Sequence, residues 1–204
     1  MSSPKRQERQ QEPRRIVRKT VARIAGGLMR DRRGVAAVEF ALVLPFMLVL
    51  FLGVTELNSA LTLDRKVSQA ASSVADLVAQ ADKLKSSEVN DLLKLSRAVL
   101  DPYPEAPLKV VVASVWMKEV NQPRVVWSRA MNTSQWGTNS APPIELPQEL
   151  TRQKGTYLVV AHAEYEHRPN FAAVLKDVFN SATITLSDTY YLRPRVSTSV
   201  ECCN

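Results

Sequence analysis

The sequence predicts an α+β protein: an N-terminal transmembrane helix that continues into a helical stalk, packed on an antiparallel sheet of about four strands. Three observations predict this fold class. An apolar run covers residues 35–54, helical spacing of apolar residues follows it, and β-branched segments dominate the C-terminal half. The expected parts are a basic cytoplasmic leader (1–34), a transmembrane helix (35–56), a helical stalk (57–101) and an extracytoplasmic α+β domain (102–204).

The apolar run is long enough to cross a membrane. Residues 35–54 form a stretch of 20 residues in which Glu39 is the only charge. As a helix it would extend for roughly 30 Å, the thickness of a bilayer's hydrocarbon core. A helix buried in a protein core rarely runs this far without a polar face, and a secretory signal has a shorter apolar region with a small-residue cleavage site. The run therefore predicts a single transmembrane helix.

The positive charge of the chain is concentrated before this run. Residues 1–33 contain eleven Lys or Arg and three acids, so they carry a formal charge of +8, while the remainder carries −1. A basic segment beside a membrane helix predicts a cytoplasmic N-terminus and an extracytoplasmic C-terminal domain. The leader is then either an amphipathic helix on the anionic lipid surface or a solvated tail. This distribution argues against a nucleic-acid-binding surface.

Helical spacing of apolar residues continues beyond the membrane segment. It predicts that the first helix reaches about Lys85. A second helix is expected to begin with Ser86 or Ser87 as its N-cap. It should stop at Asp101 and Pro102, because proline disfavours helical backbone in the residue before it.

β-Branched and aromatic residues then predict an antiparallel sheet. The sequence KEVNQP between the first two β-rich segments is typical of a hairpin turn. The expected strands cover residues 109–117, 124–130, 156–166 and 182–192, with a loop over 132–151 and a short helix over 171–179.

Glu39 is an unexpected charge, five residues into the apolar run. An ionised carboxylate in hydrocarbon costs at least a few kcal/mol, and such acids usually face a partner or a pathway. Glu39 either lies at headgroup depth without a role, lines a transport path, or binds a positive charge on another protein. A single span offers no path by itself, and the residues before Glu39 favour the third interpretation.

These residues resemble a type IV prepilin processing site. In GVAAVEF, residues 34–40, a basic leader ends in Gly34, and Glu39 is the fifth residue after it. The resemblance implies that a membrane aspartyl prepilin peptidase cuts between Gly34 and Val35, with Glu39 and Phe40 in the recognised sequence. It also implies that Glu39 neutralises the new α-amino group of a neighbouring subunit. A paired charge in an apolar bundle is far less costly than an unpaired one.

The longer stretch GVAAVEFALVLPFMLVLFLGVTEL is similar to the TadE-like pseudopilins of tight-adherence, or Flp-type, pilus systems. Pro45, Gly53 and Glu56 fall where that family's pattern has a proline, a glycine and an acid. The resemblance implies partners among other pilins, pseudopilins and the inner-membrane platform proteins of a pilus machine. Pro45 is expected to bend the helix within a bundle, although membrane helices tolerate proline in general.

Side chains that would carry catalysis are sparse. The sequence has no phosphate-binding loop, nucleophile elbow, His-Glu-x-x-His or dinucleotide fingerprint. His162 and His167 fall on opposite faces of one expected strand, so they form a poor ligand set and are interpreted as solvated strand residues. Trp116 and Trp127 are expected in cross-strand packing or in the core. No enzyme activity, cofactor or metal is therefore expected.

The two cysteines of the chain, Cys202 and Cys203, are adjacent. In an oxidising compartment they form a vicinal disulfide, link two subunits, or stay as thiols of a frayed tail. Two thiolates alone do not complete a zinc site. The sequence leaves these alternatives open.

The combined interpretation is a single-pass inner-membrane pseudopilin of a tight-adherence pilus machine, cut after Gly34, with a non-catalytic domain outside the cytoplasm. Such a protein would serve adhesion or secretion. One alternative is an uncleaved, single-span scaffold of an envelope complex. Another is an anchored extracytoplasmic hydrolase, which would need a site that the sequence does not reveal.

Overall fold

The computed structural model describes residues 34–169 and 183–203. The chain divides into two compact units, residues 1–53 and residues 54–204. Helix α2, Val35–Ala79, is 45 residues long and belongs to both units. The leader up to Arg33 and the helix expected over 171–179 lie outside the described residues.

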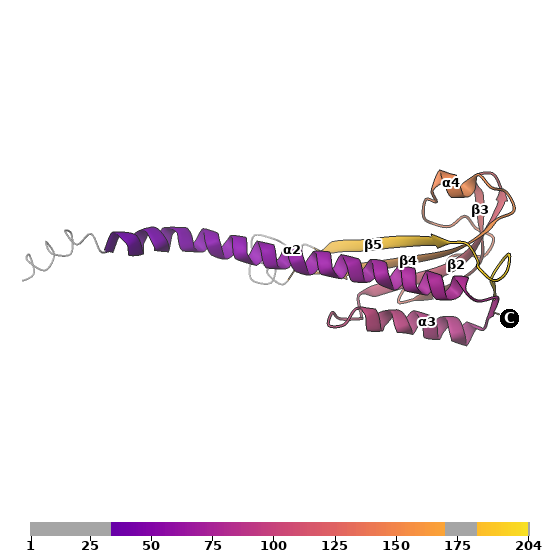
Figure 1. The fold of residues 1–204 in the computed structure, drawn as a ribbon, viewed down its shortest axis with the longest axis horizontal. Coiled ribbons are helices and arrows are strands. Elements are labelled where there is room, and N and C mark those ends of the chain that lie inside the picture. The colour runs from indigo at the N-terminus through magenta and orange to yellow at the C-terminus, as the bar shows by residue number, and fades with distance from the viewer. Residues whose placement is uncertain (1–33, 170–182, 204) are drawn as a thin grey trace, which may run out of the picture. The chain divides into compact units, whose positions relative to one another are not determined.

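The second unit contains a four-stranded antiparallel sheet in the order β3-β2-β4-β5 (Figure 1). The predicted α+β fold class is therefore confirmed. β2 and β3 form a hairpin in which Asn121 adopts a positive φ of 57°, a conformation that asparagine tolerates better than most residues. Each strand lies close to its expected position: Leu108–Glu119 for β2, Gln122–Met131 for β3, Tyr157–His167 for β4 and Ile184–Leu192 for β5.

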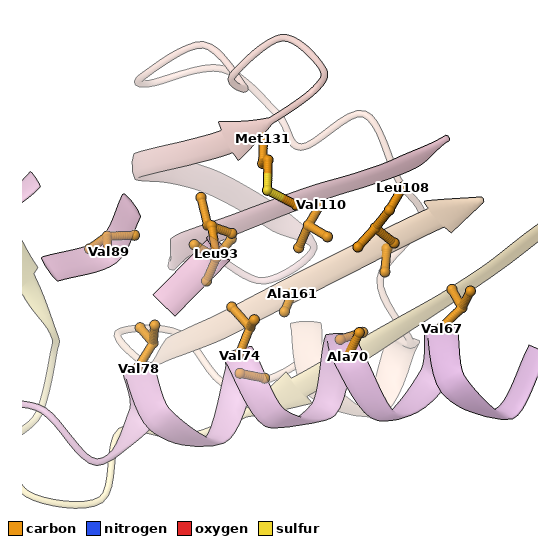
Figure 2. Packing of buried hydrophobic residues seen from close by; sticks show 14 of the residues in the cluster. Val67, Ala70, Val74, Val78, Val89, Leu93, Leu108, Val110, Met131 and Ala161 are labelled. Carbon is orange, nitrogen blue, oxygen red and sulfur yellow. The ribbon is translucent and has the colours of Figure 1, made fainter. Parts of the chain in front are cut away.

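The main core lies between one face of this sheet and two helices, the C-terminal part of α2 and helix α3, Ser86–Val99, which contributes Val89 and Leu93 (Figure 2). From Leu63 to Ala79 the buried residues of α2 recur at intervals of three and four, as one face of a helix requires. Half of these buried positions are alanines, whose small side chains allow a helix to lie close to a sheet. The sheet contributes Leu108, Val110, Val112, Trp127, Met131, Val159, Ala161, Ala163 and Tyr165 to the same cluster.

An irregularity in the β2–β3 register allows β3 to place buried side chains in the cores on both faces of the sheet. Ser114 pairs with Trp127, but the next residue, Val115, pairs with Val125, so Val126 is an extra residue on β3. Trp127 therefore belongs to the core beneath α2, whereas Val125 belongs to a second core on the opposite face. Four side chains from residues 132–151 pack against that second core, namely Trp136, Ile144, Leu146 and Leu150, and Tyr191 of β5 packs against it from the sheet itself.

Helix α2 ends earlier than the sequence predicts, at Ala79 instead of Lys85. The backbone N–H of Arg195 donates to the Ala79 carbonyl at 2.8 Å. Shortly afterwards β1, Lys83–Leu84, pairs in parallel with β6, Glu201–Cys202. The chain leaves the helix because these contacts with the C-terminal segment replace the helical hydrogen bonds.

The second helix, α3, covers Ser86–Val99 and thus nearly the expected range. Its N-cap residue is Lys85, so the expectation of Ser86 or Ser87 at this position is wrong. The Lys85 N–H donates to Oε2 of Glu88 at 2.7 Å. The Glu88 side chain therefore satisfies a backbone donor at the start of the helix.

The loop expected over residues 132–151 contains one further element, the one-turn helix α4, Gln148–Thr151. The Thr151 carbonyl accepts the N–H of Asn121 at 3.0 Å, and the Thr151 hydroxyl donates to Oδ1 of Asn121. These contacts attach α4 to the β2–β3 hairpin. Four residues carry too little periodicity to predict a helix from sequence.

Lys66 of α2 stabilises the C-terminal end of α3. Its Nζ donates to the carbonyl oxygens of Val99 at 3.0 Å and of Asp101 at 2.8 Å. The last carbonyls of a helix have no partner within the helix and attract positive charge. Lys66 therefore joins the two helices through charge-assisted hydrogen bonds.

Replacement of Lys66 by methionine should lower the free energy of unfolding by about 1–2 kcal/mol, because it removes a charged donor and keeps the apolar stem. Denaturant unfolding of the full chain in detergent measures the difference. Lys94→Met is the control, since Lys94 forms an exposed pair with Asp91 whose loss should have little effect. Equal losses in the two variants would contradict the role assigned to Lys66.

Candidate functional site

The N-terminal part of α2 has the properties of a membrane span. Among the described residues α2 is the one helix that is long and apolar enough, with a mean hydropathy of 2.6 over an 18-residue window of which no part is buried. Its large apolar side chains are exposed, for example Phe46 at 72% and Leu50 at 69%. Such a surface needs a bilayer or an apolar partner to cover it. The helix indicates a single-pass membrane protein.

The residues of the predicted processing site lie at the start of this helix. Gly34 immediately precedes Val35, the first residue of α2, and Glu39 follows one helical turn later on the same side. Val35, Glu39 and Phe40 are all exposed. Within the described part of the chain, no hydrogen bond or ion pair engages the Glu39 carboxylate, so it is accessible to a positive group from elsewhere.

The described structure does not itself require glycine at Gly34. A Cβ built on Gly34 would meet no heavy atom within 4 Å, and its φ lies outside the left-handed region. Gly53 has the same open surroundings. The cleavage expected after Gly34 stays a prediction.

Helix α2 continues through Pro45. Proline lacks the N–H of an ordinary helical residue, so one backbone hydrogen bond is missing at this point. The bend expected at Pro45 stays a prediction.

A buried polar contact connects α2 to the sheet just beyond the apolar run. Nε2 of His167, the last residue of β4, lies 3.0 Å from Oε1 of Glu56. The two side chains are only 8% and 12% exposed. The interpretation of His167 as a solvated residue is therefore wrong. Strand alternation gives the correct face for His167, but it does not reveal that α2 covers this face.

Replacement of His167 by alanine should lower the free energy of unfolding by about 3 kcal/mol, because it leaves the Glu56 carboxylate buried without its partner. Glu56→Gln should cost much less, since an amide can still form a hydrogen bond with the imidazole ring. Denaturant unfolding of the full-length variants, followed by circular dichroism, measures both effects. A His167→Ala protein as stable as the wild type would show that this contact contributes nothing.

The opposite side of β4 carries His162. Its Nδ1 lies 2.8 Å from Oγ1 of Thr189 on β5, and the side chain is half-buried, so His162 is a strand residue that is only partly solvated. Burial lowers the pKa of His162, an effect that the nearby carboxylates of Glu164 and Asp188 oppose. Folding therefore disfavours the protonated form of His162 relative to the unfolded chain.

The lowered pKa of His162 predicts stability that is lost in acid. Between the folded-state pKa and 6.5, the unfolded chain binds more protons than the folded chain, so the free energy of unfolding rises with pH. This stabilisation is complete above 6.5 and disappears as the pH falls through the folded-state pKa. His162→Gln should therefore reduce the difference in unfolding free energy between about pH 7.5 and about pH 5.5. An unchanged difference would contradict the prediction.

Next to His162, Lys109 of β2 pairs with two carboxylates of β4. Its Nζ lies 3.2 Å from Glu164 and 2.6 Å from Glu166. The hydrogen bonds to Glu166 and Glu164 raise the pKa of Lys109, and the Lys109 ammonium lowers the pKa of Glu166.

Among residues 34–169 and 183–203, no three His, Cys, Asp or Glu side chains are grouped as a metal site.

Two tryptophans pack within the second unit, and the two cysteines are bonded to each other. Trp116 stacks on Tyr157 of the neighbouring strand with ring centroids 6.2 Å apart, and Trp127 is buried. The expected cross-strand and core packing of these tryptophans is confirmed. Cys202 and Cys203 are joined by a disulfide.

Comparison with known protein families finds a match for one segment of the chain. Residues 34–76 match the family model described as TadE-like protein. No curated protein and no solved structure matches the chain significantly. The matched segment begins at Gly34 and contains the apolar run, Glu56 and most of the buried face of α2. The resemblance predicted from the sequence is therefore confirmed: residues 34–76 are TadE-like, which fits a component of pilus assembly.

Proposed function

We propose that the chain is a pseudopilin-like component of a tight-adherence pilus system, anchored in the bacterial inner membrane with its second unit outside the cytoplasm. The observation that carries the proposal is the TadE-like match, which begins at Gly34 and continues along an exposed apolar helix. The formal charge of +8 before Gly34 supports the cytoplasmic orientation of the N-terminus.

The first step of the proposed function is hydrolysis of the peptide bond between Gly34 and Val35 by a membrane aspartyl prepilin peptidase. Water adds across this bond, so the leader leaves with the Gly34 carboxylate and Val35 gains an α-amino group. The open surroundings of Gly34 support access of a protease to the backbone. Cleavage also removes eleven Lys or Arg, the charges that would hold this end of the helix at the cytoplasmic surface.

The second step is recognition between subunits through Glu39. Its carboxylate binds the new α-ammonium group of a neighbouring Val35, so that each charge has a partner in apolar surroundings. The exposed position of Glu39 near the beginning of α2 supports this contact. The pairing also sets the axial offset between two helices, because it joins different positions along them.

The exposed apolar side chains of α2 supply the remaining contact surface. Before assembly, Phe46 and Leu50 would contact lipid. After assembly, they would contact other pilins, pseudopilins or platform proteins of the inner membrane. The second unit would serve as an interaction domain outside the membrane.

Deletion of the gene in its native host tests this function. The deletion strain should lack tight-adherence pili in electron micrographs, and the wild-type gene supplied on a plasmid should restore them. A scaffold of a different envelope complex predicts normal pili in the deletion strain. Normal piliation would therefore overturn the proposed function.

A further inference from the structure

The C-terminal segment forms a clasp over the connection between α2 and α3. We define the clasp as residues 195–203. Its backbone N–H groups donate to three successive parts of the connection: Arg195 to Ala79 at 2.8 Å, Glu201 to Asp82 at 3.0 Å, and Cys203 to Leu84 at 3.1 Å.

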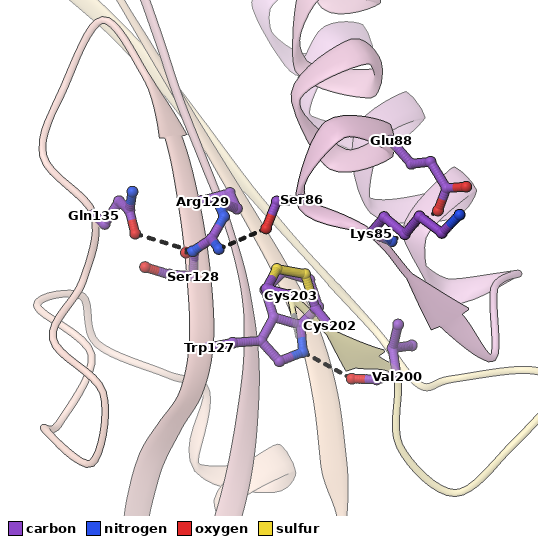
Figure 3. Close-up of a disulfide and its surroundings, with 10 residues drawn as sticks. All are labelled: Lys85, Ser86, Glu88, Trp127, Ser128, Arg129, Gln135, Val200, Cys202 and Cys203. Carbon is purple, nitrogen blue, oxygen red and sulfur yellow. Dashed lines mark hydrogen bonds between the residues drawn. A yellow bond between two sulfur atoms is a disulfide. The ribbon is translucent and has the colours of Figure 1, made fainter.

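The clasp is also anchored in the core. Val200 is only 1% exposed, and its carbonyl accepts the indole N–H of Trp127 at 2.7 Å (Figure 3). Cys202 and Cys203 are half-buried and pack against the core cluster that contains Val200 and Trp127. The clasp therefore closes the end of the main core.

The last hydrogen bond of the clasp depends on an unfavourable backbone conformation. Cys203 has a φ of 76°, which residues with a side chain rarely adopt. The disulfide between Cys202 and Cys203 joins neighbouring residues in a small ring. A small ring restricts the backbone of both residues, so it holds Cys203 in a conformation that an open pair of thiols would leave.

We propose that Cys202 and Cys203 are a thiol–disulfide exchange site, and that the state of this bond decides whether the last residues of the clasp, from Glu201 to Cys203, stay closed over the connection. The partner is a protein with a reactive dithiol or disulfide pair. This proposal rests on the proposed extracytoplasmic location, where disulfides form and persist.

Formation of the Cys202–Cys203 disulfide needs only one oxidant, the disulfide of the partner protein. A thiolate of one cysteine attacks the disulfide of an oxidising partner and forms a mixed disulfide. The thiolate of the other cysteine then attacks this bond at the sulfur of its neighbour. The products are the Cys202–Cys203 disulfide and the reduced partner, which takes up the two protons and the electron pair lost by the two thiols. The reverse reaction with a dithiol partner opens the clasp.

The test uses the full-length protein, purified in detergent from the membrane fraction after free thiols have been blocked with a maleimide. We expect no maleimide on the cysteines of the isolated protein, and two maleimides after reduction with dithiothreitol. Amide hydrogen exchange is then compared in the oxidised and reduced proteins, by mass spectrometry of C-terminal peptides that contain Glu201 and Cys203. Exchange at these peptides should become at least about tenfold faster on reduction.

A variant with Cys202→Ser and Cys203→Ser provides the matched control. It should exchange as fast as the reduced wild type and should not respond to dithiothreitol. A wild-type protein that shows no disulfide at all before reduction, or equal exchange in the oxidised and reduced wild type, would overturn the proposal. The assay does not involve pili, so its failure is distinguishable from a failure of the proposed function.

Discussion

Cells that carry Glu39→Ala should assemble no tight-adherence pili, although the variant protein stays in the inner membrane. If the proposed contact between subunits exists, the substitution leaves the α-ammonium group of a neighbouring Val35 without a counter-charge in apolar surroundings, which costs on the order of several kcal/mol for each contact. The membrane span itself becomes more apolar, so insertion should not suffer. Electron microscopy of the cells and alkaline extraction of their membranes measure the two effects separately.

Two further variants sharpen this prediction. Glu39→Gln keeps the size of the side chain and removes its charge, so it should also abolish assembly. Glu119→Ala is the control, because Glu119 is an exposed carboxylate whose partner, Lys154, lies on the surface of the second unit. Normal pili in the Glu39→Ala strain would exclude the proposed contact between subunits.

Gly34→Leu should block removal of the leader. The active site of the peptidase is expected to bind the backbone around Gly34 closely and in an extended conformation. A branched side chain at this position would keep the backbone from entering the active site. The structure leaves open space around Gly34, so the substitution should not disturb the fold. Immunoblots of cells that contain the peptidase should show only the full-length protein.

Gly53→Leu is the matched control for this experiment. Gly53 lies on α2, the helix that begins directly after Gly34, and has equally open surroundings, but it is far from the proposed cut. This variant should be processed like the wild type. Processing of the Gly34→Leu protein at the wild-type level would contradict the assigned cleavage site.

Much of the fold could be predicted from the sequence because its signals are local. Apolar residues at helical spacing identify the buried face of α2, from Leu63 onward, without knowledge of its partner. Alternation along β4 likewise places His162 and His167 on opposite faces of the sheet. The motif around Glu39 is also contiguous, so the TadE-like resemblance is visible in the sequence alone.

The features that the sequence does not reveal depend on residues far apart in the chain. Helix α2 ends at Ala79 because Arg195 binds its carbonyl, and no pattern near Ala79 signals this contact. The pairing of β1 with β6 involves only two residues in each strand, too few for a periodic signal. The contact between Glu56 and His167 is a similar case. Neither Glu56 nor His167 is unusual in the sequence, and only the fold brings the two side chains together.

The N-terminal residue of the protein in its native host tests the central claim most directly. The protein should be purified from membranes of cells that contain the pilus machine, and its N-terminus determined by Edman degradation and intact mass. Cleavage after Gly34 predicts the sequence Val-Ala-Ala-Val-Glu and a mass that lacks residues 1–34. A protein that retains the leader, or begins at any residue other than Val35, would contradict the account.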